Sequence, residues 1–292
     1  MSEPRLGAHM SIAGGPANAL LRGDSIACDT IQMFTRSSSR WRSKALSPEQ
    51  MRAFEAARQE TGIHPIIAHS SYLINLASPK ESLWQRSVEA LITELIRCQQ
   101  LDIPAYVLHP GHHTGSGEAE GLARVAEGLR TALQATAEDQ VTILLENTAG
   151  QGTGLGYTFE HLSWLIKHAE PQERLGVCFD TAHAFAAGYE FRRPAAYGEM
   201  LGTFDDVIGL ERLGVIHLND SKRDLGSRVD RHEHIGEGYI GRKAFRLLVN
   251  DERLRDVPMI LETPKGPGLR EDIKALALLR DLIQKKSIEV EV

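Results

Sequence analysis

The sequence has 292 residues, of which 42% are hydrophobic and 25% are charged, and its formal net charge at pH 7 is −6. This composition is ordinary for a soluble globular protein, and no apolar run approaches the roughly 20 residues of a membrane span, so we expect no contact with a membrane. A net negative charge argues against a nucleic-acid-binding protein, although basic residues cluster at 35–44 and 221–231 and bound divalent ions would offset the charge.

Eight short apolar runs, rich in Leu and β-branched residues, are the strand candidates. In chain order, the expected strands are about 6–12, 30–35, 65–70, 105–110, 142–147, 175–181, 214–219 and 257–263. Segments with helical spacing of their apolar residues lie between most of them, at 47–61, 79–101, 118–136, 158–168, 195–212, 241–250 and 270–286. Strands that alternate with helices predict a parallel sheet, and eight such units favour a closed (β/α)8 TIM barrel over an open sheet. No linker or repeat divides the chain, so we expect a single domain over residues 1–292.

Seven of these apolar runs end in, or run directly into, a side chain that can bind a metal, whereas the run TIQMF leads to Thr35. The seven residues are His9, His69, His109, Glu146, Asp180, His217 and Glu262. In a TIM barrel the C-terminal ends of all strands meet at one rim, where the functional groups of such proteins lie. Four imidazoles and three carboxylates at one rim predict a site for several metal ions.

Two further pairs strengthen this prediction. Asp180 is followed three residues later by His183, and Asp230 is followed two residues later by His232. Imidazole and carboxylate together are ligands for Zn²⁺ or Mn²⁺. A single His is usually a surface or core residue, and we assign His64, His161 and His168 to that class. His112 and His113 lie in a Gly-rich loop and are weaker candidates, and His9 is either a ligand or a neighbour of one.

Several longer segments resemble the signature segments of the endonuclease IV family, which comprises apurinic/apyrimidinic (AP) endonucleases of base-excision repair. They are GAHMSIAGG (7–15), HSSYLINLASP (69–79), HPGHH (109–113), LLENTAGQGTGLG (144–156), GVCFDTAHAFAAGY (176–189), HLNDSKRDLGSRVDRHEHIGEGYIG (217–241) and PMILET (258–263). The resemblance extends from about residue 6 to 283 and implies a TIM barrel that holds three zinc ions, with Mn²⁺ as an option at one of them. It implies that His69, His109 and Glu146 bind the first ion. The implied second set is Glu146, Asp180, His217 and Glu262, and the third is His183, Asp230 and His232. Glu146 would bridge two ions, and we therefore expect it to be catalytic.

The resemblance also implies that rim loops contact damaged double-stranded DNA. The candidate contact residues are Arg36, Arg40, Trp41, Tyr72, Asn219, Ser221, Lys222 and Arg228. Arg and Lys bind phosphates, and an exposed aromatic ring can stack on a base or insert between bases. The loop departs from the family, because Ser39 stands where relatives commonly carry an inserting Arg and Ser70 stands where an Asp often follows the first ligand His.

The expected activity is zinc-dependent hydrolysis of the DNA backbone 5′ to an abasic site, which leaves a 3′-hydroxyl and a 5′-deoxyribose phosphate, together with removal of groups that block 3′ ends. One alternative is a sugar isomerase or epimerase on the same barrel, with one or two divalent ions; such an enzyme needs a proton-transferring base, and no Lys stands at the end of an expected strand. A second alternative is a metal-containing DNA-binding protein without catalysis. We expect a monomer without an obligate protein partner. The absence of a secretory signal and the three widely spaced cysteines, Cys28, Cys98 and Cys178, favour a cytoplasmic protein with reduced thiols.

Overall fold

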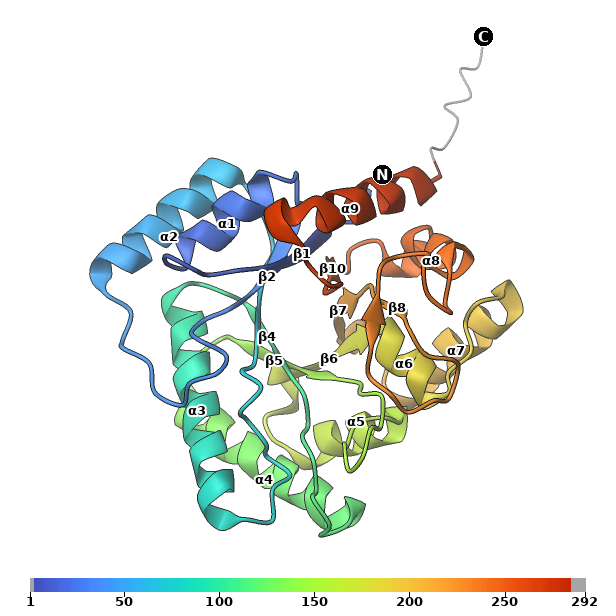
Figure 1. Ribbon diagram of the computed structural model, residues 1–292. Helices are drawn as coiled ribbons and strands as arrows, with labels where there is room; N and C mark the ends of the chain where they lie inside the picture. The colour runs from blue at the N-terminus through green and yellow to red at the C-terminus, as the bar shows by residue number, and fades with distance from the viewer. Residues whose placement is uncertain (1–2, 285–292) are drawn as a thin grey trace.

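The computed structural model describes residues 3–284, and its centre is a closed barrel of eight parallel strands (Figure 1). Around the barrel the strand order is β1-β10-β7-β6-β5-β4-β3-β2. The strands are β1 Leu6–Met10, β2 Thr30–Phe34, β3 Ile66–His69, β4 Ala105–Leu108, β5 Thr142–Glu146, β6 Leu175–Asp180, β7 Leu213–His217 and β10 Met259–Leu261. Each of the eight strands coincides with one expected from the sequence, and the predicted TIM barrel is confirmed.

Helices surround the barrel (Figure 1). They are α1 Ala17–Asp24, α2 Pro48–Thr61, α3 Glu81–Gln100, α4 Glu118–Ala135, α5 Phe159–His168, α6 Thr181–Ala187, α7 Pro194–Val207, α8 Arg242–Val249 and α9 Arg270–Leu282. Short 3₁₀ turns cover Gln172–Arg174, Leu210–Arg212, Glu252–Leu254 and Pro267–Leu269, and two short strands, β8 Asp220–Ser221 and β9 His232–Glu233, pair antiparallel. Within residues 3–284, no helix has the length and apolar character that crossing a membrane requires.

The helix predictions are correct in position, with two omissions. α2 begins as expected, because Ser47 Oγ accepts from the Gln50 amide, the Gln50 side chain accepts from the Ser47 amide, and Pro48 occupies the first turn. The expected segment 195–212 divides into α7 and a 3₁₀ turn, and the last two residues of 270–286 lie outside the described residues. The helices α1 and α6 were not predicted from the sequence.

α6 is short, and Asp180 fixes its start. Asp180 ends β6 and caps the helix, since its Oδ1 accepts from the His183 backbone amide at 2.7 Å. Gly188 follows the last helical residue as the C-cap and has a positive φ of 113°. An Asp before a short Ala-rich segment and a following Gly were the available signals. The consequence is that His183 lies in the first turn of α6, next to the end of β6.

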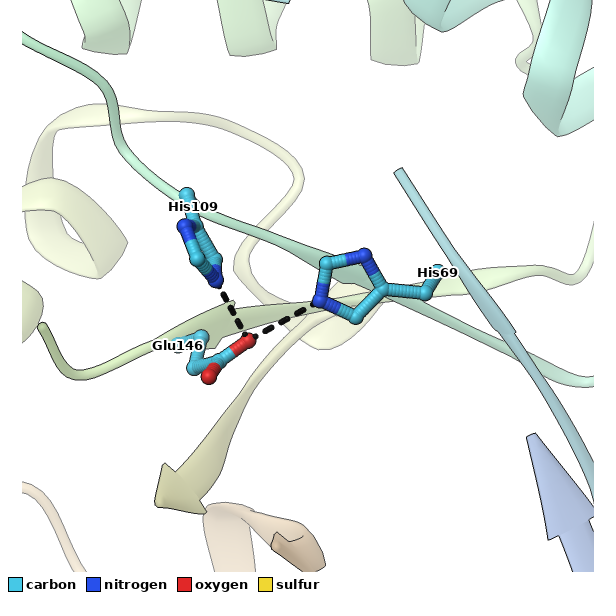
Figure 2. Close-up of side chains that lie close together, drawn as sticks. All are labelled: His69, His109 and Glu146. Atoms are coloured by element: carbon cyan, nitrogen blue, oxygen red, sulfur yellow. Dashed lines mark hydrogen bonds and ion pairs between the residues drawn. The ribbon is translucent and has the colours of Figure 1, made fainter. Parts of the chain in front are cut away.

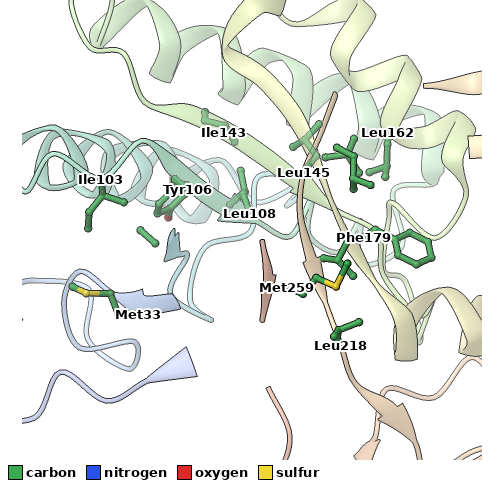
Figure 3. Packing of buried hydrophobic residues seen from close by; sticks show 14 of the residues in the cluster. Met33, Ile103, Tyr106, Leu108, Ile143, Leu145, Leu162, Phe179, Leu218 and Met259 are labelled. Carbon is green, nitrogen blue, oxygen red and sulfur yellow. The ribbon is translucent and has the colours of Figure 1, made fainter. Parts of the chain in front are cut away.

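Two apolar layers stabilise the barrel. The larger one lies between strands and helices, and Figure 3 shows part of it, including Tyr106, Leu145 and Phe179. The smaller one is a separate cluster of buried residues made up of Ile67, Val107, Leu144, Cys178, Val215 and Ile260. Because side chains alternate between the two faces of a strand, these six residues face the barrel interior.

Candidate metal centre

The barrel delivers six candidate ligands to one rim. Four of them are the last residues of their strands, and the other two directly follow β4 and β10. Each lies two residues after a member of the interior apolar cluster, so strand alternation directs it to the same interior side. The six are His69, His109, Glu146, Asp180, His217 and Glu262. The apolar cluster therefore forms the floor on which the polar groups lie.

His69, His109 and Glu146 form the first group (Figure 2). The Nε2 atoms of His69 and His109 lie 3.1 and 2.9 Å from the same atom, Oε2 of Glu146. Glu146 is completely buried, while the side chain of His109 is 35% exposed. Two imidazole nitrogens that face one carboxylate oxygen offer three ligand atoms to one ion.

The other oxygen of Glu146 faces a second group. Glu146 Oε1 lies 3.3 Å from Nδ1 of His217, and that nitrogen lies 3.1 Å from Oε2 of Glu262 and 3.8 Å from Oδ2 of Asp180. The candidate ligand atoms of these four residues all lie within 4.8 Å of one another. The two oxygens of Glu146 thus point to two neighbouring groups, which is the arrangement that a bridging carboxylate requires.

A third group lies beside Asp180. His183 Nε2 is 3.3 Å from Asp230 Oδ2, and His232 Nε2 is 3.4 Å from Asp230 Oδ1. His232 Nε2 also lies 3.8 Å from Asp180 Oδ2. Among the described residues, this buried nitrogen has no hydrogen-bond partner, although unpaired buried polar atoms are costly. The nine residues predicted as ligands are therefore brought together in three adjacent groups.

Four imidazoles are oriented by a second contact. In each of them one ring nitrogen lies within hydrogen-bonding distance of a backbone carbonyl or side-chain amide oxygen. Nδ1 of His69 faces the carbonyl oxygen of Ser70, and Nδ1 of His183 faces that of Asn147. Nε2 of His217 faces Oε1 of Gln32, and Nδ1 of His232 faces the carbonyl oxygen of Glu262. When that nitrogen donates its proton, the other nitrogen keeps its lone pair for the centre. Metal-binding imidazoles are held in this way, so the residues present fit a metal ion.

The electrostatics of the cluster are consistent with this fit. Burial alone would raise the pKa of Glu146, but the imidazoles of His109 and His217 lower it well below its usual range. Burial also opposes protonation of His183, yet Asp180 and its other acidic neighbours raise its pKa well above the usual range. In the absence of metal, Glu146 and its imidazole neighbours thus favour each other's charged forms. A bound divalent cation would supply the positive charge beside the carboxylates in place of protons on the imidazoles, so metal binding would release protons.

Gln32 was not predicted to lie at the site, and Asn219 was predicted to contact DNA. Gln32 is buried in β2, where its amide donates to Glu262 Oε1 at 2.5 Å and its oxygen faces His217. A polar residue inside an apolar strand was the available signal. Asn219 is also fully buried; it donates to Asp180 Oδ2 at 2.6 Å and accepts from the Glu262 amide. Both side chains orient candidate ligands.

Two other residues lie against this centre. His9 Nδ1 lies 3.0 Å from Gln32 Nε2 and 3.6 Å from Glu262 Oε1, and burial lowers its pKa. His9, near the C-terminal end of β1, therefore contacts the proposed second set of ligands. Cys178 is buried in the apolar floor, and burial raises the pKa of its thiol. All three cysteines are free and buried.

Three of the residues predicted to contact DNA are buried in this structure, and each binds partners inside the protein. Arg36 forms a buried ion pair with Glu94, with 2.6 Å between Nη2 and Oε1, and donates to the carbonyl oxygens of Arg40 and Trp41. Asn219 binds Asp180, as described above. Ser221 is buried, and its hydroxyl donates to the carbonyl oxygen of Arg223 at 2.8 Å. These side chains organise loops and have no polar group free to reach a phosphate.

The other predicted contacts remain accessible. Arg40, Lys222 and Arg228 are exposed, and Tyr72 is 76% exposed. Trp41 is half-buried, and the guanidinium of Arg86 lies 4.4 Å from its ring centroid. The guanidinium of Arg228 lies 4.3 Å from the ring centroid of Tyr157.

A pocket of about 570 Å³ opens over the three groups. Six of the candidate ligands line it, together with the aromatic rings of Phe34 and Tyr72. Lys222, Arg231 and Lys265 also line it, and the last two are cations that the sequence analysis did not select. A negatively charged substrate could therefore reach the carboxylate-rich centre past positive groups.

Comparison with known proteins gives consistent matches over nearly the whole chain. Residues 23–281 match the family model described as xylose isomerase-like TIM barrel. The chain is 53% identical over 281 residues to a probable endonuclease 4 of Chloroflexus aurantiacus, covering 96% of this chain and 99% of the relative. It is 47% identical over 282 residues to a probable endonuclease 4 of Geobacter sulfurreducens, covering 97% and 95%.

Solved structures show the same likeness. The crystal structure of endonuclease IV from Thermus thermophilus superimposes with a TM-score of 0.84 at 40% identity and covers 96% of this chain and 98% of that one. A D-tagatose 3-epimerase-like protein superimposes with a TM-score of 0.74 at 21% identity, with 95% and 96% covered, and this second likeness concerns the fold alone.

Proposed function

The chain belongs to the endonuclease IV family, and on that basis we propose that it is a divalent-metal-dependent AP endonuclease, which cleaves the DNA backbone on the 5′ side of an abasic site. The observation that carries the proposal is Glu146. Its two carboxylate oxygens face two adjacent groups of candidate ligands, and three of these ligands, His69, His109 and Glu262, line a pocket with cations on its wall. Two adjacent metal ions can stabilise both the attacking and the leaving oxygen of a phosphodiester, and a carboxylate that faces both ligand groups would hold such ions next to each other.

We propose that the centre holds three zinc ions, with Mn²⁺ as an option at one position. The first would be held by His69, His109 and Glu146. The second would be held by Glu146, Asp180, His217 and Glu262. The third would be held by His183, Asp230 and His232, and Asp180 lies close enough to His183 and His232 to join this set. Nitrogen and carboxylate oxygen ligands are the donors that zinc accepts in catalytic sites.

The chemistry divides between the ions and the protein. When bound, divalent ions activate water for attack and neutralise charge on the attacking and leaving oxygens. Glu146 fixes the separation of the first two ligand groups, and the apolar floor excludes water from below. Phosphate oxygens would approach past Lys222 and Arg231, and the exposed ring of Tyr72 would stack on a base or in the gap at the damaged nucleotide. The products would be a 3′-hydroxyl and a 5′-deoxyribose phosphate, and groups that block 3′ ends would be removed at the same centre.

The loop after β2 would contact the DNA differently from that of most relatives. Ser39 is exposed, and its hydroxyl lies 3.3 Å from that of Ser37, so this loop presents hydroxyl groups where relatives commonly present an inserting Arg. Arg40 and the half-buried Trp41 would make the contacts of this loop. We further propose that the substrate is damaged double-stranded DNA and that the protein acts as a monomer in the cytoplasm.

The sugar isomerase or epimerase alternative is weaker. It rests on a shared barrel with proteins of low sequence identity, and no Lys is present at the ends of the eight strands to act as a base. A metal-containing protein that only binds DNA would not need a buried carboxylate between two ligand groups.

A cleavage assay tests the proposal directly. Zinc-loaded protein is incubated with a duplex that carries one abasic site and with the same duplex undamaged. We expect a single cut at the abasic site, and a 3′ end that a DNA polymerase can extend. Glu146→Gln, purified in the same way, controls for contaminating nucleases. Absence of cleavage by fully metal-loaded wild-type protein, or a product whose 3′ end cannot be extended, would contradict the proposal.

A further inference from the structure

The third group of candidate ligands depends on a loop rather than on the barrel. Asp230 and His232 lie between β7 and α8, and His232 begins β9, where it pairs with Ser221 of β8. The other proposed ligands stand at strand ends or, like His183, in the helix that follows one. A loop position needs its own means of fixing the ligands.

Asp220, at the start of this loop, supplies an internal anchor. Its side chain is fully buried, and each carboxylate oxygen accepts from backbone amides of the returning loop. Oδ2 accepts from Gly236 at 2.8 Å, Gly238 at 3.1 Å and Gly241 at 3.2 Å. Oδ1 accepts from Ile240 at 2.9 Å and from the adjacent Ser221 at 2.8 Å, with Gly241 at 3.5 Å.

This arrangement is a ring of backbone N–H groups of the kind that binds anions, and a carboxylate of the same loop fills it. The close approach requires glycine at position 238, where a Cβ atom would lie 2.5 Å from Asp220 Oδ1 and 2.4 Å from the Ser221 carbonyl oxygen. Gly236 and Gly241 adopt positive φ values of 81° and 75°. Several residues of the returning loop therefore enclose the Asp220 carboxylate.

The middle of the loop is attached to neighbouring elements. The amides of Gly226 and Arg228 donate to carbonyl oxygens of α6 at 3.0 and 2.9 Å. The amide of Asp230 donates to the side-chain oxygen of Gln151, in the loop after β5, at 2.9 Å. Because α6 carries His183, these contacts join the three proposed ligands of the third ion into one unit.

We propose that Asp220 is a positioning residue for the third metal position: it closes the 220–241 loop around its carboxylate, and thereby sets the affinity for the third ion without binding that ion. Gln151 is a second positioning residue, because its side-chain oxygen accepts a hydrogen bond from the backbone amide of Asp230. This inference rests on the proposed three-metal centre. It predicts that the third position can be weakened while the first two keep their ligands and their geometry.

Asp220→Asn tests the proposal. In either orientation, the amide NH₂ would face three backbone N–H groups that now donate to a carboxylate oxygen. Equilibrium dialysis against buffered free zinc, followed by elemental analysis, gives the number and affinity of bound ions. We expect the affinity for one of three ions to fall roughly 10- to 100-fold, the range for replacing a residue that supports a metal ligand. The first two ions should remain bound.

Asp251→Asn is the matched control. Asp251 also accepts from a backbone amide, that of Arg253, but it lies before β10 at the opposite end of the barrel. The Asp251→Asn protein should retain three ions at wild-type affinity. Circular dichroism checks that both variants are folded, and hydrogen exchange of 222–231 should be faster only in Asp220→Asn.

The outcomes are distinct from those that test the proposed function. A folded Asp220→Asn protein with three ions at wild-type affinity, or one that has lost all three, would overturn the proposal. If this variant does not fold, the exposed Gln151→Ala decides, because unchanged affinity for the third ion would then overturn it. A wild-type protein that cleaves abasic DNA with only two ions would overturn this inference and leave the endonuclease function standing.

Discussion

Replacing Arg36 by methionine should destabilise the protein strongly, although Arg36 lies in a loop. Its side chain and that of Glu94 are 2% and 1% exposed, and they form an ion pair at 2.6 Å. The Tyr106 hydroxyl donates to the other oxygen of Glu94 at 2.9 Å. Removal of one partner of a buried ion pair leaves an uncompensated charge, which costs about 3–5 kcal/mol. At roughly 2 °C per kcal/mol for a chain of this length, the melting temperature should fall by about 6–10 °C.

The pH dependence of this loss has a defined sign. Burial raises the pKa of Glu94 even though Arg36 opposes the shift, and removal of Arg36 should raise it further. A carboxyl whose pKa is higher in the folded chain than in the unfolded chain loses stability as the pH rises above the unfolded value. The difference between Arg36→Met and wild type should therefore be larger at pH 8 than at pH 5.

Calorimetry of metal-free protein at the two pH values measures this difference, and the titration of the metal ligands is common to both proteins. Arg52→Met is the control, because Arg52 forms an exposed pair with Glu49, and solvent screens such a pair so that it contributes little to stability. The double variant Arg36→Met/Glu94→Gln should recover much of the loss. A loss below about 1 kcal/mol, or an equal loss at both pH values, would refute the reasoning about buried charge.

Three further predictions concern the metal centre and DNA binding. Glu146→Gln alters two ligand groups at once, so it should lower turnover by more than the roughly 10- to 100-fold that replacing a residue behind a metal ligand costs. Steady-state cleavage of an abasic duplex measures this fall. A smaller fall would contradict the bridging role of Glu146. His232→Ala should remove one of three ions and lower turnover strongly while the fold remains, as elemental analysis and circular dichroism can check; cleavage at the wild-type rate would mean that the loop ligands are dispensable. Arg40→Ala should weaken binding to a non-cleavable abasic duplex by about 1–3 kcal/mol at fixed salt. Unchanged affinity would assign recognition to Tyr72 and the 221–231 loop.

The strands and the candidate ligands could be predicted from the sequence because both follow from local rules. An apolar run that ends in His69 or Glu146 indicates a strand and also places the ligand, since parallel strands in a barrel share one rim. The helix α6 was harder to predict from the sequence, because Asp180 both ends a strand and caps the helix, with no residue between the two elements. No turn separates the two elements, and no change in the spacing of apolar residues marks the point where the strand becomes a helix.

The sequence did not reveal which polar side chains are buried, because residue type does not determine burial. Arg36 in a basic loop suggested a phosphate contact, yet its partner Glu94 lies 58 residues later and comes close only in the folded chain. Asn219 follows a ligand in sequence, but its amide is directed inward to Asp180. A sequence shows which groups a loop contains, whereas the tertiary partners decide which of them reach the solvent.

The apolar floor of the centre has a consequence for how this protein can change. Leu144 and Glu146 occupy alternate positions of one strand, and the same spacing recurs in the five other strands that contribute to the floor. Inserting or deleting one residue in such a strand before the floor residue would turn the ligand and the floor residue outward together. Point substitutions can therefore retune the centre, but changes of length are confined to the loops. Evolution and protein engineering alike should vary substrate range through loop length, while the six strand ends are inherited as a unit.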